Sequence, residues 1–95
     1  MKVRYSRQAR ADLRGIRSYV AERNPIAAER VMARLSEVIA KLALNPNIGR
    51  DADRKNLRIF SVRTYPYRIY YEVRGNEVHI AHVRHTARQE WTEAD

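Results

Sequence analysis

The sequence has 95 residues, 44% of them hydrophobic and 32% charged, which suffices for one core and is too short for two. The absence of cysteine excludes disulfides, a thiol nucleophile and thiolate metal ligands. No run approaches the roughly 20 consecutive apolar residues that a membrane span needs. The charged N-terminus lacks the apolar core of a signal peptide. We therefore expect a single domain over residues 1–95, located in the cytoplasm and without contact to a membrane.

The charge of the chain is strongly basic. Lys and Arg number 19 against 11 Asp and Glu, so the formal net charge is +8, and all but three of the basic residues are arginines. The planar guanidinium of arginine binds phosphates and carboxylates through paired hydrogen bonds. This composition predicts an acidic partner, either nucleic acid or an acidic protein segment. The alternative is that the charge only keeps the protein soluble.

A short strand followed by a helix is predicted at the start of the chain. Residues 2–5 alternate between polar and apolar, and Ser6 is a suitable N-cap for a helix that runs to about Arg23. Gly15 costs about 1 kcal/mol relative to alanine inside this helix, which predicts a close packing contact there. Four apolar residues at spacings of four, three and four form one face: Ala9, Leu13, Ile16 and Val20. Four arginines form another: Arg7, Arg10, Arg14 and Arg17.

A second amphipathic helix is predicted between two Asn-Pro pairs, Asn24-Pro25 and Asn45-Pro46. Its apolar residues again recur at helical spacing: Ala28, Val31, Leu35, Val38, Ile39 and Leu42. Two helices with so short a connection form an antiparallel helical hairpin. Each has one apolar face, which needs a second layer to cover it.

The second half of the chain predicts that layer. Three segments are rich in β-branched and aromatic residues: Leu57–Arg63, Pro66–Arg74 and Val78–His85. Val83 is out of phase with Val78 and Ile80, which predicts a bulge near Ala81 or His82. The predicted fold is α+β, with the order β-α-α-β-β-β and a helical hairpin packed on a small, largely antiparallel sheet.

The whole chain resembles the ParE/RelE superfamily of toxins from bacterial type II toxin–antitoxin systems, and more closely its ParE, or plasmid stabilisation, branch. The order and spacing of short segments carry this resemblance: Ala11-Asp12-Leu13, Ile16, Tyr19, Asn24-Pro25, Ala27-Ala28, Asn45-Pro46, Ile48-Gly49-Arg50, Leu57-Arg58, residues 67–71, Val78-His79-Ile80, Val83-Arg84-His85 and Ala87-Arg88. It implies a cytoplasmic toxin that a cognate antitoxin neutralises. That partner is usually a ribbon-helix-helix protein of the ParD type, through which alone the toxin would reach operator DNA. A basic, partly apolar helical hairpin also suits an acidic amphipathic segment that folds on binding.

The superfamily contains two activities. Its RelE branch cleaves messenger RNA on the ribosome, whereas its ParE branch inhibits DNA gyrase without being a nuclease. The closer resemblance to the ParE branch therefore implies gyrase inhibition. RNA cleavage needs a base or acid at the scissile phosphate and cations for the developing charge. Of the groups in the RelE pattern, this sequence keeps the third-strand arginine as Arg68. The second-strand basic positions fall at Ile59 and Ser61, the fourth-strand arginine near Thr86, and the terminal tyrosine near Thr92.

The sequence therefore favours a gyrase-inhibiting toxin that is not an enzyme. One alternative is a ribosome-dependent mRNA interferase of the RelE type, since a shifted alignment recovers Arg84, His85 or Arg88. Another is a non-toxic remnant that acts as co-repressor with its antitoxin.

No catalytic residue is assigned, but two groups of candidates follow. The candidates for toxicity or target binding are Arg68, Arg84, His85 and Arg88. The candidates for antitoxin binding are Arg10, Arg14, Arg17, Leu57, Tyr67 and Trp91. The alternative for Arg68 is an ion pair with Glu72 or Glu77, and the alternative for the helical arginines is a solvated face.

Neither a metal nor a cofactor is expected. His79, His82 and His85 are three residues apart, but the faces of a strand alternate, so these side chains should point apart. Tyr67, Tyr70 and Tyr71 have faces on which bases stack, yet at least two of the three should face the helices as core.

Overall fold

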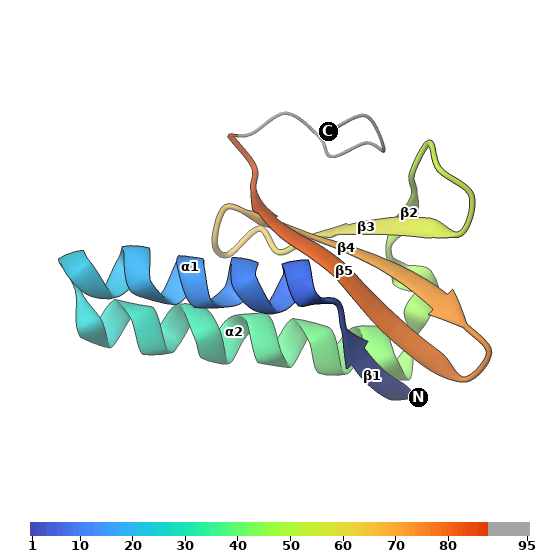
Figure 1. Cartoon of the computed structure of the whole chain (residues 1–95), viewed down its shortest axis with the longest axis horizontal. Helices are drawn as coiled ribbons and strands as arrows, with labels where there is room; N and C mark the ends of the chain where they lie inside the picture. The colour runs from blue at the N-terminus through green and yellow to red at the C-terminus, as the bar shows by residue number, and fades with distance from the viewer. Residues whose placement is uncertain (88–95) are drawn as a thin grey trace.

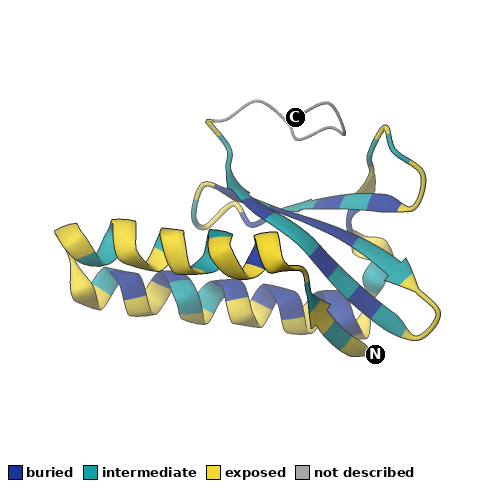
Figure 2. Cartoon of the chain, in the orientation of Figure 1, coloured by how far each residue is buried: buried dark blue, intermediate teal, exposed yellow. Residues whose placement is uncertain are grey.

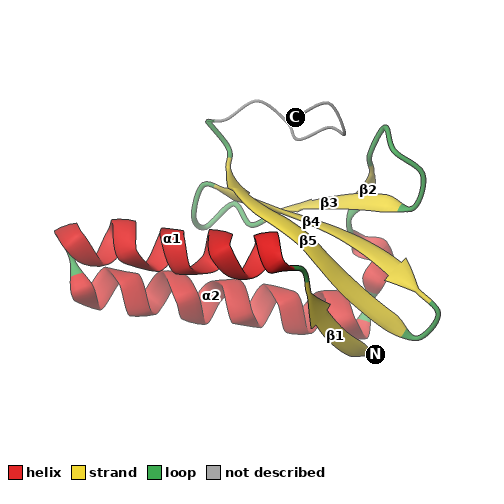
Figure 3. Cartoon of the chain, in the orientation of Figure 1, coloured by secondary structure: helices red, strands yellow, loops and turns green. Residues whose placement is uncertain are grey.

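The computed structural model describes residues 1–87, and it forms two layers (Figure 1). A five-stranded sheet is covered on one face by two long helices, with the helices and strands segregated as Figure 3 shows. The elements are β1 (Lys2–Tyr5), α1 (Arg7–Arg23), α2 (Pro25–Leu44), a 3₁₀ turn (Pro46–Ile48), β2 (Arg50–Asp51), β3 (Leu57–Ser61), β4 (Tyr67–Arg74) and β5 (Glu77–His85). The predicted α+β fold is confirmed. Strand β2 is additional, because two residues are too few to show an alternating pattern.

The strand order is β1-β5-β4-β3-β2. Strands β2 to β5 pair antiparallel with their neighbours, whereas β1 pairs parallel with β5. A parallel pair needs a long connection, and here residues 6–76, which include the helical hairpin and strands β2 to β4, connect β1 to β5. No helix within residues 1–87 is long and apolar enough to cross a membrane.

The two helices begin where the sequence placed their caps. The Ser6 hydroxyl accepts a hydrogen bond from the Ala9 amide at 2.9 Å, and the Asn24 side chain accepts one from the Ala27 amide at 3.0 Å. Asn24 also ends α1, since its own amide donates to the Val20 carbonyl. These caps fix the sharp reversal between α1 and α2.

The main core lies between the helices and the inner face of the sheet, meaning the face toward the helices (Figure 2). Helix α2 supplies most of its helical side chains, and Ala9 is the one residue of α1 that is fully buried. A smaller apolar cluster, Leu57, Ile59 and Tyr70, lies on the opposite, outer face. As predicted, two of the three strand tyrosines are core residues, Tyr67 and Tyr71.

The predicted bulge in β5 is confirmed. Tyr70 pairs with His82 while Tyr71 pairs with Ile80, so Ala81 is the extra residue. The bulge returns Val83 to the inner face opposite Ile69. It also leaves His82 beside Tyr70, with ring centroids 6.4 Å apart.

The predicted close contact at Gly15 is wrong. A Cβ atom built there meets nothing within 4 Å. The glycine that the fold needs for a close approach is Gly49, whose Cβ would overlap the Tyr71 hydroxyl. That hydroxyl accepts a hydrogen bond from the Gly49 amide at 2.9 Å and donates one to the Pro46 carbonyl at 2.7 Å.

Candidate functional site

The junction between α1 and β5 forms where β1 ends. Among residues 1–87 no strand pairs with this edge of β5 beyond Tyr5, and side chains of α1 and of its N-cap Ser6 form hydrogen bonds with β5 there. The Ser6 hydroxyl donates to the Ala81 carbonyl at 2.8 Å. One turn and a half later, the Asp12 carboxylate accepts the Val83 amide at 2.9 Å. The first turns of α1 thus satisfy polar backbone groups that a longer β1 would otherwise have paired.

Asp12 is the centre of this junction. Besides the Val83 amide, its carboxylate accepts hydrogen bonds from the side-chain Nε2 of Gln8 at 2.8 Å and from His82 Nδ1 at 2.5 Å. Because a carboxylate only accepts, the hydrogen must lie on Nδ1 of His82. The side chains of both members of this pair are at most 15% exposed. Our sequence reasoning missed this role, although Asp12 is the one acidic residue among the first 21.

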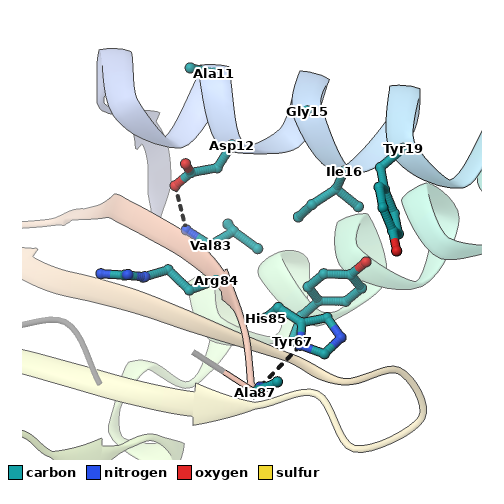
Figure 4. A pocket seen from close by; sticks show the side chains of 10 residues that line it. All are labelled: Ala11, Asp12, Gly15, Ile16, Tyr19, Tyr67, Val83, Arg84, His85 and Ala87. Carbon is teal, nitrogen blue, oxygen red and sulfur yellow. Dashed lines mark hydrogen bonds between the residues drawn. The ribbon is translucent and has the colours of Figure 1, made fainter. Parts of the chain in front are cut away.

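A hollow of about 590 Å³ opens beside the junction, between α1 and the ends of β4 and β5 (Figure 4). Its lining residues are Ala11, Asp12, Gly15, Ile16 and Tyr19 of α1 and Tyr67, Val83, Arg84, His85 and Ala87 of the sheet end. In Figure 4 the rings of Tyr19, Tyr67 and His85 gather at one end, whereas the Arg84 side chain points away from them. The lining is therefore mainly small or apolar, with a few polar ring atoms.

Those polar ring atoms have defined hydrogen positions. Burial raises the pKa of Tyr67, and the neighbouring Tyr19 phenol adds to the rise, so the Tyr67 hydroxyl stays protonated at neutral pH. The His85 ring meets Tyr67 edge-on, with centroids 5.5 Å apart. His85 Nδ1 accepts the Ala87 amide at 3.0 Å, which leaves Nε2–H as the donor of the neutral ring. These groups suit an apolar side chain with a polar edge.

Two arginines face each other on the outer face of the sheet. Arg68 of β4 pairs in register with Arg84 of β5. Arg68 Nη1 lies 3.5 Å from the Thr86 carbonyl, and the buried Nε of Arg84 has no hydrogen-bond partner among residues 1–87. Within residues 1–87 neither guanidinium has a carboxylate at ion-pairing distance. Like charges directly opposite each other destabilise a sheet, so this open end of the β4–β5 ribbon is suited to bind an anion.

The other end of the same ribbon, the paired end, is electrostatically satisfied. Glu72 lies 2.9 Å from Arg74 and 4.0 Å from Arg54. Glu77 accepts from His79 at 3.0 Å and from Arg4 at 3.2 Å. The hydrogen bond from His79 lowers the pKa of Glu77, and the bond from Arg4 lowers it further.

The structure separates the predicted target-binding residues. Arg68 pairs with Arg84 and does not line the hollow, whereas Arg84 and His85 both do. Arg88 lies outside the described residues. The three histidines point to different partners, which are Glu77 for His79, Asp12 for His82 and Tyr67 for His85. Within residues 1–87 no three His, Cys, Asp or Glu side chains gather as a metal site would need.

The predicted antitoxin-binding residues are also dispersed. Arg17 binds Glu29 at 2.6 Å, and Arg10 lies over the Tyr5 ring at 5.8 Å. Arg14 is exposed, Tyr67 lines the hollow, and Leu57 is buried in the outer-face cluster. Trp91 lies outside the described residues. Gly15, Asp12 and Tyr19 are named in the sequence patterns above, but those patterns did not place them together at a hollow, because a helix pattern does not reveal which residues border one.

The comparisons with known proteins agree with this architecture. A family model for the "ParE toxin of type II toxin-antitoxin system, parDE" matches residues 3–90. "Toxin RelE2" of Caulobacter vibrioides is 40% identical over 81 residues, which are 85% of this chain and 90% of that protein. "Putative toxin Y4kP" of Sinorhizobium fredii is 33% identical over 90 residues, covering 95% of this chain and 92% of that protein.

Two solved structures share the fold. The chromosomal ParDE toxin–antitoxin system from P. aeruginosa matches with a TM-score of 0.79 and 23% identity, over 90% of this chain and 95% of that one. The isolated E. coli RelE toxin matches with a TM-score of 0.66 and 18% identity, over 98% of this chain and 88% of that one.

Proposed function

The chain belongs to the ParE family of type II toxin–antitoxin toxins, and we propose that it inhibits DNA gyrase in the cytoplasm and thereby blocks replication. A cognate antitoxin of the ParD type, with a ribbon-helix-helix DNA-binding part, neutralises it in this proposal. The toxin would reach operator DNA only through that antitoxin. The chain would act as a binding protein and not as an enzyme.

The observation that carries this proposal is the composition of the outer sheet face. The two β3 positions where the RelE pattern has basic residues hold Ile59, which is 4% exposed, and Ser61, which pairs with Arg68. The face thus offers the Arg68–Arg84 pair without the second-strand cations of that pattern. Such a surface supports binding of an anionic group, but has no cation at the two β3 positions where the RelE pattern has charge to stabilise a cleavage transition state.

The test is paired pulse-labelling of DNA and protein synthesis just after induction of the chain without antitoxin. We expect DNA synthesis to fail first while translation continues. With purified protein, gyrase supercoiling should be inhibited. The double variant Arg68→Ala/Arg84→Ala should weaken this inhibition about 10- to 100-fold, which corresponds to one or two charge-assisted hydrogen bonds.

Arg74→Ala is the matched control, because Arg74 lies on the same strand and is already bound to Glu72. It should leave inhibition unchanged. Gyrase that stays active at a large excess of the wild-type protein would refute the proposal. Growth of the induced cells without any change in synthesis would instead support the co-repressor remnant.

A ribosome-dependent mRNA interferase is the second candidate. The Arg68–Arg84 pair favours it, since two cations at one sheet position also suit an RNA phosphate. The relative that is 40% identical is named a RelE toxin. Translation that stops before DNA synthesis, with cleaved messenger RNA in a translating extract, would establish this candidate and exclude gyrase as the primary target.

A further inference from the structure

Within residues 1–87 no packing contact explains Gly15. It lies in the interior of the 17-residue helix α1, where glycine is less favourable than alanine. Of the three glycines only Gly75 has a positive φ, so the backbone at residue 15 admits any side chain. A Cβ atom there would also meet nothing within 4 Å. If a close approach requires this glycine, none of residues 1–87 makes it, and a partner molecule is a source for the approaching group.

The position of Gly15 shows where that group would enter. Ala11 and Tyr19 lie one helical turn before and after it, and all three border the hollow (Figure 4). Across from them lie Tyr67 and Val83 of the sheet. The missing side chain at residue 15 therefore leaves room in the helix wall of the hollow, between an alanine and an aromatic ring.

The rim of the hollow indicates the charge of the occupant. Arg7 precedes Ala11 by four residues and Arg14 follows it by three, so both flank Ala11 on the helix surface. Both are exposed, and neither has a carboxylate at ion-pairing distance within residues 1–87. Arg17, further along the helix, is already bound to Glu29. With a net charge of +8 on the chain, the complementary segment is acidic.

We propose that Gly15 determines antitoxin specificity, because the hollow beside it receives one bulky apolar or aromatic side chain from an acidic segment of the cognate antitoxin. The inference rests on the proposed antitoxin partner and adds the residue that selects it. At about 590 Å³ the hollow is within the range of about 300–1,000 Å³ typical of binding pockets. A side chain at residue 15 fills the space that the antitoxin side chain needs, and so excludes it.

The test fills the hollow from the toxin side. The probe is the antitoxin encoded by the reading frame next to the toxin gene, purified and titrated against wild-type and variant toxin. Gly15→Leu should bind it at least about 30-fold more weakly, because loss of one buried large side chain is worth about 2 kcal/mol or more. Its melting temperature should be equal to or above that of the wild type, since leucine is the better helix former.

Two further variants make the result specific. Ala11→Leu narrows the same hollow from one turn earlier and should weaken binding in the same direction. Ser36→Leu adds the same side chain at an exposed position of α2, away from the hollow, and should bind like the wild type. An alanine scan of the bulky antitoxin residues should find one whose truncation weakens binding to wild-type toxin but not to Gly15→Leu.

The outcomes separate the two proposals. If wild-type toxin does not bind this antitoxin, the proposed partner is wrong and the inference falls with it. If the wild type binds, and folded Gly15→Leu and Ala11→Leu both bind within about threefold of it, the partner stands and the role of Gly15 is refuted.

Discussion

The two ends of the β4–β5 ribbon are built from similar residues and differ in electrostatics. At the paired end, Glu72 lies beside Arg54 and Arg74. Glu77 lies beside His79 and Arg4. At the open end, Arg68 faces Arg84, and in the described part of the chain the buried Nε of Arg84 has no hydrogen-bond partner. Stability alone would favour the first arrangement everywhere. The second sacrifices some stability, which is typical of a surface that meets a charged partner.

The largest effect that we predict concerns Asp12, the carboxylate that joins α1 to the ribbon near its open end. Asp12→Ala leaves the Val83 amide and His82 Nδ1 without this acceptor, and should lower the free energy of unfolding by about 2–3 kcal/mol. Urea denaturation measures it. Gln8→Ala, which removes one exposed hydrogen bond to the same carboxylate, should cost about 0.5 kcal/mol or less. Equal losses in both variants would show that Asp12 does not hold the junction.

Charge reversal at each end of β4 should change the free energy of unfolding by an intermediate amount, with opposite signs at the two ends. Arg68→Glu places a carboxylate opposite Arg84 and should raise the free energy of unfolding by about 0.5–1 kcal/mol. Arg74→Glu places a carboxylate beside Glu72 and should lower it by a similar amount. Denaturant titration of both variants in one buffer compares them directly.

The inhibitory activities of the two charge-reversal variants should follow the order opposite to their stabilities. The stabilised Arg68→Glu variant should inhibit its target at least about 10-fold less, while the destabilised Arg74→Glu variant keeps its inhibition. A supercoiling assay at matched concentrations measures this. If both variants lose stability and neither loses activity, the contrast between the two ends has no functional meaning.

The smallest effect belongs to Glu77 at the paired end, and it depends on pH. Hydrogen bonds from His79 and Arg4 hold its pKa below the ordinary value of 4.5, so the ionised group stabilises the fold above that value. The contribution is lost as the pH falls through the lowered pKa. Glu77→Gln should therefore melt below the wild type at neutral pH and approach it in acid. Thermal scans across this range check the prediction, and a difference that grows toward acid would contradict it.

The elements that the sequence predicts correctly are those that depend on neighbouring residues. Ser6 and Asn24 cap helices in the structure as their positions indicate, because a cap needs only a side chain and the next turn. The position of Val83, out of phase with Val78 and Ile80, located the bulge in β5, because the alternation of a strand is also a pattern of neighbouring residues. The predicted close contact at Gly15 was wrong, because the energetic cost of a glycine in a helix depends on the local backbone. Which atoms face that glycine depends on the packing of distant residues.

The candidate site was only partly accessible from the sequence. The alternation in β4 places Arg68 on a face, but only the register between β4 and β5 decides that Arg84 and not Thr86 lies opposite it. Leu57 shows the same limit, because it is buried in a cluster with Tyr70 of the neighbouring strand β4, and the pairing of β3 with β4 is not visible in a local pattern.

By itself the sequence determined the order of elements, the helical hairpin, the mainly antiparallel sheet and the basic charge, because these follow from periodicity and composition. The tertiary structure alone decided three things: that Asp12 accepts the Val83 amide at the edge of β5, that Arg68 and Arg84 meet without a carboxylate among residues 1–87, and that Gly15 borders a hollow. Each depends on residues about 16 to 71 positions apart in the chain, whose distance is set by packing between layers and not by any local pattern.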